Sequence, residues 1–198
     1  MSPHPVKRAI LSVTDKTGLA EFAAFLAQGG VELVSTGGTR KMLLEEGLQV
    51  TAVSEVTGFP EILGGRVKTL HPRIAGGVLA DTRNPEHLAA LAEHDIPAVD
   101  LVCVNLYDFA RARAMGLDLE QAVEQIDIGG PTMLRSAAKN FHAVLVVPDP
   151  TDYGRVMDSL RANDFAAPLE LRRQLAAKTF ALTSRYDAMI ADYLGRFV

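Results

Sequence analysis

The sequence has one cysteine, no tryptophan and no apolar run of the roughly 18 residues that a membrane-spanning helix needs. A single cysteine cannot form a disulfide within the chain, which excludes a disulfide-stapled fold and leads us to expect a reducing, cytoplasmic environment. Cys103 lies in the apolar run 101–104, which indicates a buried core residue rather than a nucleophile. Residues 1–5 lack the apolar core of a signal peptide.

The chain also lacks an excess of positive charge, since 20 Lys and Arg residues face 24 Asp and Glu residues for a net charge of −4. This balance argues against binding nucleic acid through a general positive field. An anionic ligand would have to be held by a few local cations and by backbone amides. With 198 residues, of which 48% are hydrophobic, the chain is large enough for a sizeable core.

Short apolar runs alternate with helical patterns along the chain. We expect strands at residues 9–13, 31–34, 49–53, 101–105 and 143–147. Helical patterns end at Gly29-Gly30 and at Gly47, and the stretch from Pro168 to Leu194 predicts one long C-terminal helical segment. The alternation predicts an α/β fold with a mostly parallel sheet covered on both faces.

Residues 54–80 interrupt this alternation. They contain many glycines and prolines, too many for a plain helix. A long irregular segment in a compact domain is more often functional than a linker, so we expect this segment to contribute to a site.

Three places where we expect a strand to give way to a helix have the composition of anion sites. They are SVTDKTG (12–18), STGGT (35–39) and DIGGPT (127–132), and they lack the glycine spacing of a P-loop. Helix N-termini favour negative charge, and such junctions share one crevice in an open parallel sheet. We expect Thr39 to cap its helix and Pro131 to take the first helical position. Each junction alone could be an ordinary turn, but the three together indicate a phosphorylated small molecule.

The segment GGRVKTLHP (64–72) gathers cations and hydrogen-bond donors on one loop, and the alternative is a solvated charged turn. His71 precedes Pro72 and is interpreted as a structural turn residue. Neither a paired-cysteine motif nor HExxH occurs, so we expect no metal.

Four further residues remain ambiguous from the pattern alone. Asn105 and Tyr107 follow an apolar strand and could face the crevice, although Tyr107 could equally be core packing. Asp127 could be a turn or cap residue, and Lys139 could simply complement the dipole of the preceding helix.

In this order, the segments resemble the IMP cyclohydrolase domain of the bifunctional purine-biosynthesis family (AICAR transformylase/IMP cyclohydrolase). The resemblance covers essentially the whole chain and is carried by SVTDKTG (12–18), STGGT (35–39), TGFPEILGGRVKTLHP (57–72), NLY (105–107), EQIDIGGPTMLRSAAKN (124–140) and AVLVV (143–147). Asp108, where the family usually has proline, and the less basic stretch 81–83 depart from the pattern. The family fold is similar to methylglyoxal synthase, which implies three α/β/α layers.

The resemblance implies ring closure of 5-formamidoimidazole-4-carboxamide ribotide (FAICAR) to IMP with loss of water, the last step of de novo purine biosynthesis, without a cofactor. Lys68 would stabilise charge on the formyl oxygen, Asp127 would accept or orient the carboxamide N–H, and Tyr107 and Lys139 would assist proton transfer and water loss. The 5′-phosphate would occupy the first two junctions. The implied substrate-binding residues are Ser12, Thr14, Lys16, Thr17, Thr36, Gly37, Gly38, Thr39, Arg66, Thr69, Asn105, Ile128 and Gly129.

The resemblance also implies one IMP cyclohydrolase domain over residues 1–198, with the transformylase domain absent. A stand-alone enzyme served by a separate AICAR transformylase and an excised domain both fit that absence. Family members are homodimers, so we expect the long C-terminal helix or a neighbouring surface to form an interface.

Two other functions stay open. A methylglyoxal synthase-like lyase would carry a Gly-Gly-Asp loop, whereas this chain has Gly64-Gly65-Arg66. A nucleotide-sensing regulatory module would need the phosphate junctions without the four catalytic groups together.

Overall fold

A computed structural model describes residues 5–107, 109 and 115–197 of the chain. Its sheet is built from β1 (Arg8–Ser12), β2 (Glu32–Ser35), β3 (Thr51–Ala52), β4 (Leu101–Val104) and β5 (Leu145–Val147). The strand order is β3-β2-β1-β4-β5, and all pairs are parallel. The predicted parallel sheet is therefore confirmed. The order reverses direction between β1 and β4, which in open α/β sheets is where a crevice opens beyond the carboxyl ends of the strands.

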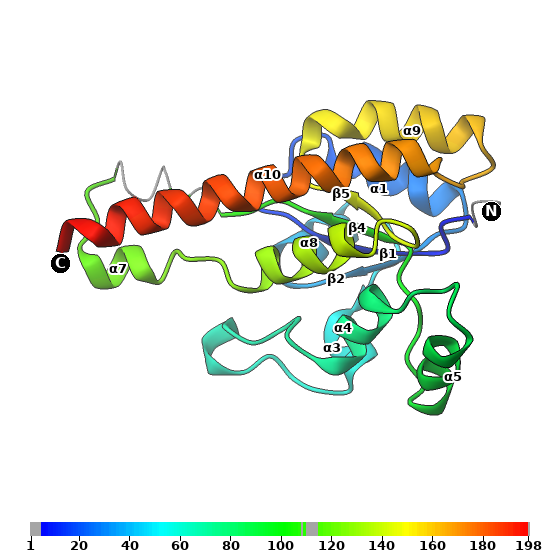
Figure 1. The fold of residues 1–198 in the computed structure, drawn as a ribbon, viewed down its shortest axis with the longest axis horizontal. Coiled ribbons are helices and arrows are strands. Elements are labelled where there is room, and N and C mark those ends of the chain that lie inside the picture. The colour runs from blue at the N-terminus through cyan, green and yellow to red at the C-terminus, as the bar shows by residue number, and fades with distance from the viewer. Residues whose placement is uncertain (1–4, 108, 110–114, 198) are drawn as a thin grey trace.

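Helices cover both faces of this sheet (Figure 1). On one face, α1 (Leu19–Gln28) packs against α9 (Tyr153–Ala162). On the other, α4 (Pro72–Leu79) packs against α8 (Gly129–Lys139). The other helices among the described residues are α2 (Gly37–Glu45), α3 (Val53–Thr57), α5 (Pro85–Glu93), α7 (Leu119–Val123) and α10 (Leu169–Leu194), with short 3₁₀ turns at Leu63–Gly65, Pro150–Asp152 and Gly195–Phe197.

The middle of β1 and the whole of β4 and β5 are buried, because helices lie over both faces of the sheet. Ile10, Val102 and Val146 have at most 1% of their surface exposed. Cys103 belongs to the same core, as predicted, and burial raises the pKa of its thiol to about 12. A thiol with that pKa stays protonated at neutral pH, which agrees with a structural role.

The segment expected to be irregular is more helical than its glycines suggest. Only Thr51–Ala52 of the expected strand 49–53 is extended, since Val53 already begins α3, and α4 contains both Gly76 and Gly77. A Cβ at Gly77 would lie 2.5 Å from the carbonyl oxygen of Pro97. Gly77 therefore allows α4 to pack closely against the segment that leads into β4.

The predicted C-terminal helix is confirmed as α10, which begins directly after Pro168. It runs beside β5 and α8, and its C-terminal half extends past the sheet above α7 (Figure 1). There a second apolar cluster forms from Phe109, Ala122, Tyr186 and Tyr193. None of the helices in the described part of the chain has the length and apolar composition needed to cross a membrane.

Candidate functional site

A cavity of about 650 Å³ opens beyond the carboxyl ends of β1, β2 and β4, at the point where the strand order reverses. The first two junctions, the loop before α4 and the start of α8 all line it. Among the residues predicted from the sequence, its lining includes Ser12, Thr14, Lys16, Thr36, Gly37, Gly38, Thr39, Arg66, Lys68, Thr69, Asn105, Tyr107, Asp127, Ile128 and Gly129. Thr17 and Lys139 are outside the lining.

The loop after β1 is held by the amide side chain of Asn105. The Oδ1 atom of Asn105 accepts hydrogen bonds from the backbone N–H groups of Thr14 and Asp15, at 2.7 and 3.0 Å, and its Nδ2 donates to the carbonyl of Asp15 at 2.8 Å. Thr17 binds the Asp15 carboxylate, and these hydrogen bonds lower the pKa of Asp15. Asn105 and Thr17 therefore shape the loop, while Ser12, Thr14 and Lys16 line the cavity.

The junction after β2 differs from the prediction in its cap. Thr36 is the N-cap of α2, and Thr39 lies inside the helix. The buried Thr39 hydroxyl donates to the carbonyl of Val13 and accepts from its N–H, both at 3.0 Å, so it joins the two loops. The amides of the first turn have no acceptor within the helix and are available to an anion. Gly37 has a φ of +48°, a conformation that glycine adopts without strain.

Lys68 reaches the start of α2 from the loop before α4. Its Nζ lies 3.0 Å from the Glu61 carboxylate. A Cβ at Gly65 would lie 2.9 Å from Cε of Lys68, and one at Gly37 would lie 3.5 Å from its Nζ. The two glycines leave room for the lysine side chain, and Glu61 fixes its charged end.

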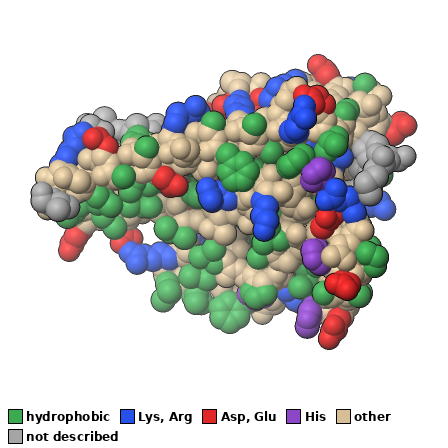
Figure 2. All heavy atoms as spheres, in the orientation of Figure 1, with side chains coloured by type: hydrophobic (Ala, Val, Ile, Leu, Met, Phe, Trp, Pro, Cys, Tyr) green, Lys and Arg blue, Asp and Glu red, His purple; other side chains and the backbone are tan. Residues whose placement is uncertain are grey.

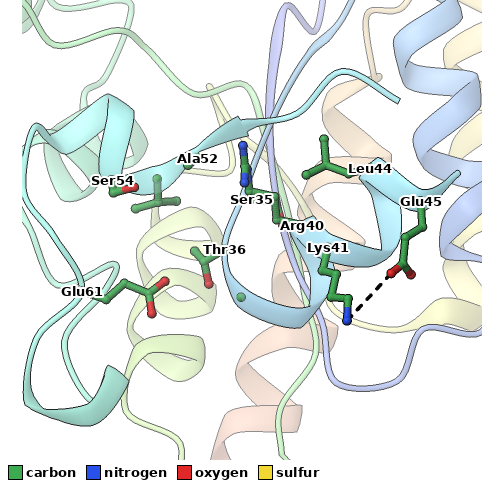
Figure 3. A pocket seen from close by; sticks show the side chains of 11 residues that line it. Ser35, Thr36, Arg40, Lys41, Leu44, Glu45, Ala52, Ser54 and Glu61 are labelled. Carbon is green, nitrogen blue, oxygen red and sulfur yellow. Dashed lines mark ion pairs between the residues drawn. The ribbon is translucent and has the colours of Figure 1, made fainter. Parts of the chain in front are cut away.

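A second hollow of about 560 Å³ adjoins the cavity and shares Thr36 and Gly37 with it. Figure 3 shows Glu61 pointing toward Thr36, with the ion pair between Lys41 and Glu45 at the other end of this hollow. Glu61 lines this second hollow, whereas Lys68, which it holds, lines the cavity.

Two more contacts join this loop to the third junction. Arg66 forms an ion pair with Glu124, which follows α7 and also lines the cavity. A Cβ at Gly129 would lie 2.9 Å from Oγ1 of Thr69, so the glycine allows a close approach there. His71 has the structural role that we expected, because its Nδ1 accepts from the N–H of Arg73 and caps α4.

The third junction does not follow a strand, contrary to our expectation. Helix α7 precedes it, and α8 begins at Gly129, so Pro131 is the third helical residue rather than the first. Proline is accommodated there because the first-turn N–H groups need no partner within the helix.

Asp127 is both a cap and a cavity residue. Its Oδ1 accepts from the N–H of Gly130 at 2.8 Å, and the backbone N–H of Tyr107 also donates to the carboxylate. Burial raises the pKa of Asp127, and these two hydrogen bonds oppose the rise. Tyr107 is 49% exposed at the cavity and is not a core residue. Its neighbour Asp108, the departure noted above, lies outside the described residues.

Lys139 is not brought to the other three proposed catalytic residues. It is the exposed last residue of α8, about 15 Å along the helix axis from Gly129. The following Asn140 donates to the carbonyls of Val78 and Ala80, which ties this end of α8 to α4. A catalytic role for Lys139 stays a prediction.

Sequence reasoning missed three residues that support the site. Glu61 pairs with Lys68, Gly130 makes room for the Asp127 carboxylate, and Tyr186 accepts a hydrogen bond from the Asp127 amide. The first two lie within the matched segments 57–72 and 124–140, whereas Tyr186 lies 59 residues from its partner and no local pattern marks it. Within the described residues, no three His, Cys, Asp or Glu side chains gather as a metal site would require.

Comparisons with known proteins agree with this architecture. Residues 18–132 match the family described as the MGS-like domain, and residues 137–197 match the AICARFT/IMPCHase bienzyme family. The chain is 54% identical over 190 residues to the bifunctional purine biosynthesis protein PurH of Magnetococcus marinus, covering 96% of this chain and 36% of that protein. It thus spans about a third of the length of this curated relative.

The crystal structure of ForH is also similar, with a TM-score of 0.86 and 38% sequence identity over 96% of this chain and 97% of that one. The MGS-like match alone extends over more than half of the sequence. The chain belongs to the MGS-like domain family, and its C-terminal residues 137–197 match the AICARFT/IMPCHase bienzyme family.

Proposed function

We propose that the chain is an IMP cyclohydrolase, which closes FAICAR to IMP with loss of water. The observation that carries this proposal is the convergence of Lys68, Tyr107 and Asp127 on one cavity whose other wall is two anion-binding loops. Similarity to PurH, a bifunctional purine biosynthesis protein, supports a purine nucleotide as the ligand.

The 5′-phosphate fits the part of the cavity between the loop after β1 and the start of α2. The free amides of the first turn of α2, the hydroxyls of Ser12 and Thr14, and Lys16 can all donate to phosphate oxygens there. A few local donors suffice for one phosphate group, which explains how a chain with a net charge of −4 can bind an anion.

Ring closure joins the carboxamide nitrogen to the formyl carbon of the same molecule. A carboxamide is a weak nucleophile, so holding the two groups in contact is a large part of the catalysis. Asp127 would take or orient the carboxamide proton, and the Lys68 ammonium would stabilise the negative charge that develops on the formyl oxygen. Tyr107 would then assist proton transfer to that oxygen as it leaves as water. The leaving water carries the formyl oxygen together with one proton from the carboxamide nitrogen and one from the formamide nitrogen. The N–C bond and the C=N double bond that form therefore balance the C–O bond that breaks, without any external reactant.

The alternative functions fit the cavity less well. A lyase of the methylglyoxal synthase type would place a carboxylate after the two glycines, where Arg66 stands. A regulatory module would need the phosphate loops alone, whereas here three reactive groups line the same cavity.

The decisive experiment is to incubate the purified chain with FAICAR and to follow IMP by absorbance. We expect closure well above the uncatalysed rate, and no acceleration would contradict the proposal.

Lys68→Ala should lower kcat by roughly 100-fold or more, because it removes the cation at the developing oxyanion, while IMP binding should weaken only a few-fold. Lys41→Ala is the matched control, since Lys41 pairs with Glu45 outside the cavity.

We also propose that the protein is a cytoplasmic homodimer that receives FAICAR from a separate AICAR transformylase activity. Its free Cys103 suits a reducing compartment. Figure 2 shows apolar side chains gathered below the C-terminal half of α10, where the exposed Leu119 and Val123 of α7 lie. Such a surface is typical of an interface. Sedimentation should reveal a dimer, and a monomer mass at every concentration would count against it.

A further inference from the structure

We infer that Tyr186 of α10 is a positioning residue for Asp127, and that its hydroxyl is needed for full turnover. The inference rests on the proposed function and deepens it, because it assigns part of the site to a helix that lines none of the cavity.

The contact is a hydrogen bond between side chain and main chain. The backbone N–H of Asp127 donates to the Tyr186 hydroxyl oxygen at a distance of 2.7 Å. Asp127 precedes the first residue of α8, so its amide has no acceptor within that helix. An amide in such a half-buried position needs a partner, and Tyr186 provides one.

This bond completes the set of contacts that orients the Asp127 carboxylate. The N–H groups of Gly130 and Tyr107 hold the carboxylate itself. A Cβ at Gly130 would lie only 2.3 Å from its Oδ2, so the backbone of Gly130 forms a wall against it. The side chain is thus fixed relative to α8, and Tyr186 fixes the main chain from which it extends.

The tyrosine hydroxyl, rather than the ring, is what this contact uses. The ring of Tyr186 packs in the apolar cluster with Phe109, Ala122 and Tyr193, where a phenylalanine ring would pack equally well. Tyr193 lies in the same cluster, and its ring meets Phe109 edge to face at 5.5 Å. The two tyrosines are similarly buried, at 5% and 7% exposed, but only Tyr186 holds Asp127.

Tyr186 lies beyond the part of the chain that matches the MGS-like domain and within the part that matches the AICARFT/IMPCHase family. Helix α10 therefore does more than cover the edge of the sheet. It sets the position of a residue that, in the proposed mechanism, handles the proton of the reacting nitrogen.

The experiment compares Tyr186→Phe, Tyr193→Phe, Asp127→Asn and the double variant Tyr186→Phe/Asp127→Asn in the full chain. Tyr186→Phe should lower kcat by roughly 10- to 100-fold, as expected for a displaced catalytic group, with KM for FAICAR and IMP affinity little changed. Tyr193→Phe should keep the kcat of the unmodified protein. The kcat of the double variant should lie less than about twofold below that of Asp127→Asn, because the effect of Tyr186 passes through Asp127.

A second readout does not depend on turnover. Amide hydrogen exchange at Asp127 should become faster in Tyr186→Phe and stay unchanged in Tyr193→Phe. The inference would be overturned if Tyr186→Phe left both the exchange rate at Asp127 and kcat unchanged. It would also be overturned if the kcat losses of the two single variants multiplied in the double variant. If the unmodified chain fails to close FAICAR, the proposed function falls, while the exchange experiment still decides whether Tyr186 positions Asp127.

Discussion

Asp127 combines two requirements that oppose each other. In the proposed reaction its carboxylate must be charged to accept a proton, yet burial disfavours the charge and raises its pKa, despite hydrogen bonds from the amides of Gly130 and Tyr107. A carboxylate with a raised pKa is a better proton acceptor near neutral pH than an exposed one. The environment that makes Asp127 costly to ionise is therefore the one that suits it for the proposed reaction.

The raised pKa of Asp127 predicts how the stability of the fold depends on pH. Because the pKa of Asp127 is raised in the folded state, the folded chain binds the proton more tightly than the unfolded chain does. As the pH falls through that pKa, the unmodified protein should gain stability relative to Asp127→Asn, which cannot bind the proton. Urea unfolding at pH 7.5 and at pH 4.5 measures the difference.

Asp15→Asn provides the control of opposite sign, since hydrogen bonds from Thr17 lower the pKa of Asp15. The unmodified protein should lose stability relative to this variant as the pH falls below 3.8, the ordinary pKa of Asp, so urea unfolding of this pair is extended to pH 3. The same direction of change in both comparisons would contradict the assignment of a raised pKa to Asp127.

The sequence was enough to predict which residues line the cavity where the chemistry of anion binding requires particular residue types. It was not enough to predict which residues contact one another. The hydroxyls and glycines of the first two junctions and the cations of the loop at 64–72 do line the cavity. The role of Thr39 was missed because its partner, Val13, belongs to another loop. Lys139 shows the converse, since it shares a sequence block with Asp127 while α8 carries it to the opposite end of the helix. Only the three-dimensional arrangement shows that Asp127 lies at the cavity and that Lys139 does not.

At the scale of helices and strands, hydrophobic periodicity predicted the type of each element better than the residues at which it begins and ends. The long helix α10 was predictable because no glycine or proline interrupts it. In α4, by contrast, Gly77 lowers helix propensity by only about 1 kcal/mol, and packing against residues 97–99 outweighs this. The expected strand before Asp127 was wrong because Gly129-Gly130 resembles a strand-to-helix junction, whereas α7 supplies the preceding element.

The loop after β1 and the start of α8 are each held in place by a neighbouring element. The loop after β1 is held by the Asn105 side chain, which follows β4 and binds two of its amides and one carbonyl. The start of α8 is fixed in turn by α10 through Tyr186. Rigid elements on both sides of the cavity thus hold the short segments that would touch the substrate, which is the condition for holding a reactive conformer.

For the whole molecule, the site is assembled from segments that are distant in the sequence and meet where the strand order reverses. The cavity is lined by residues between Ser12 and Met133, so a ligand bound there should stabilise the entire fold rather than one loop. The mostly parallel sheet was predictable from the alternation of elements. The strand order that creates the crevice was not, because periodicity contains no information on which strands are neighbours.

Thermal unfolding with IMP and with inosine tests this assembly and the place of the phosphate together. At 100 times its dissociation constant, IMP should raise the free energy of unfolding by about 2.7 kcal/mol. Inosine at the same concentration should stabilise the chain less, since it lacks the phosphate that we place between the first two junctions. Lys16→Ala should reduce the effect of IMP and leave that of inosine unchanged, because Lys16 lines the phosphate end of the cavity. Lys7→Ala is the control, since Lys7 precedes β1 at the opposite end of the sheet and should change neither effect. Equal stabilisation by IMP and inosine would place the phosphate outside the two loops, even if the chain closes FAICAR.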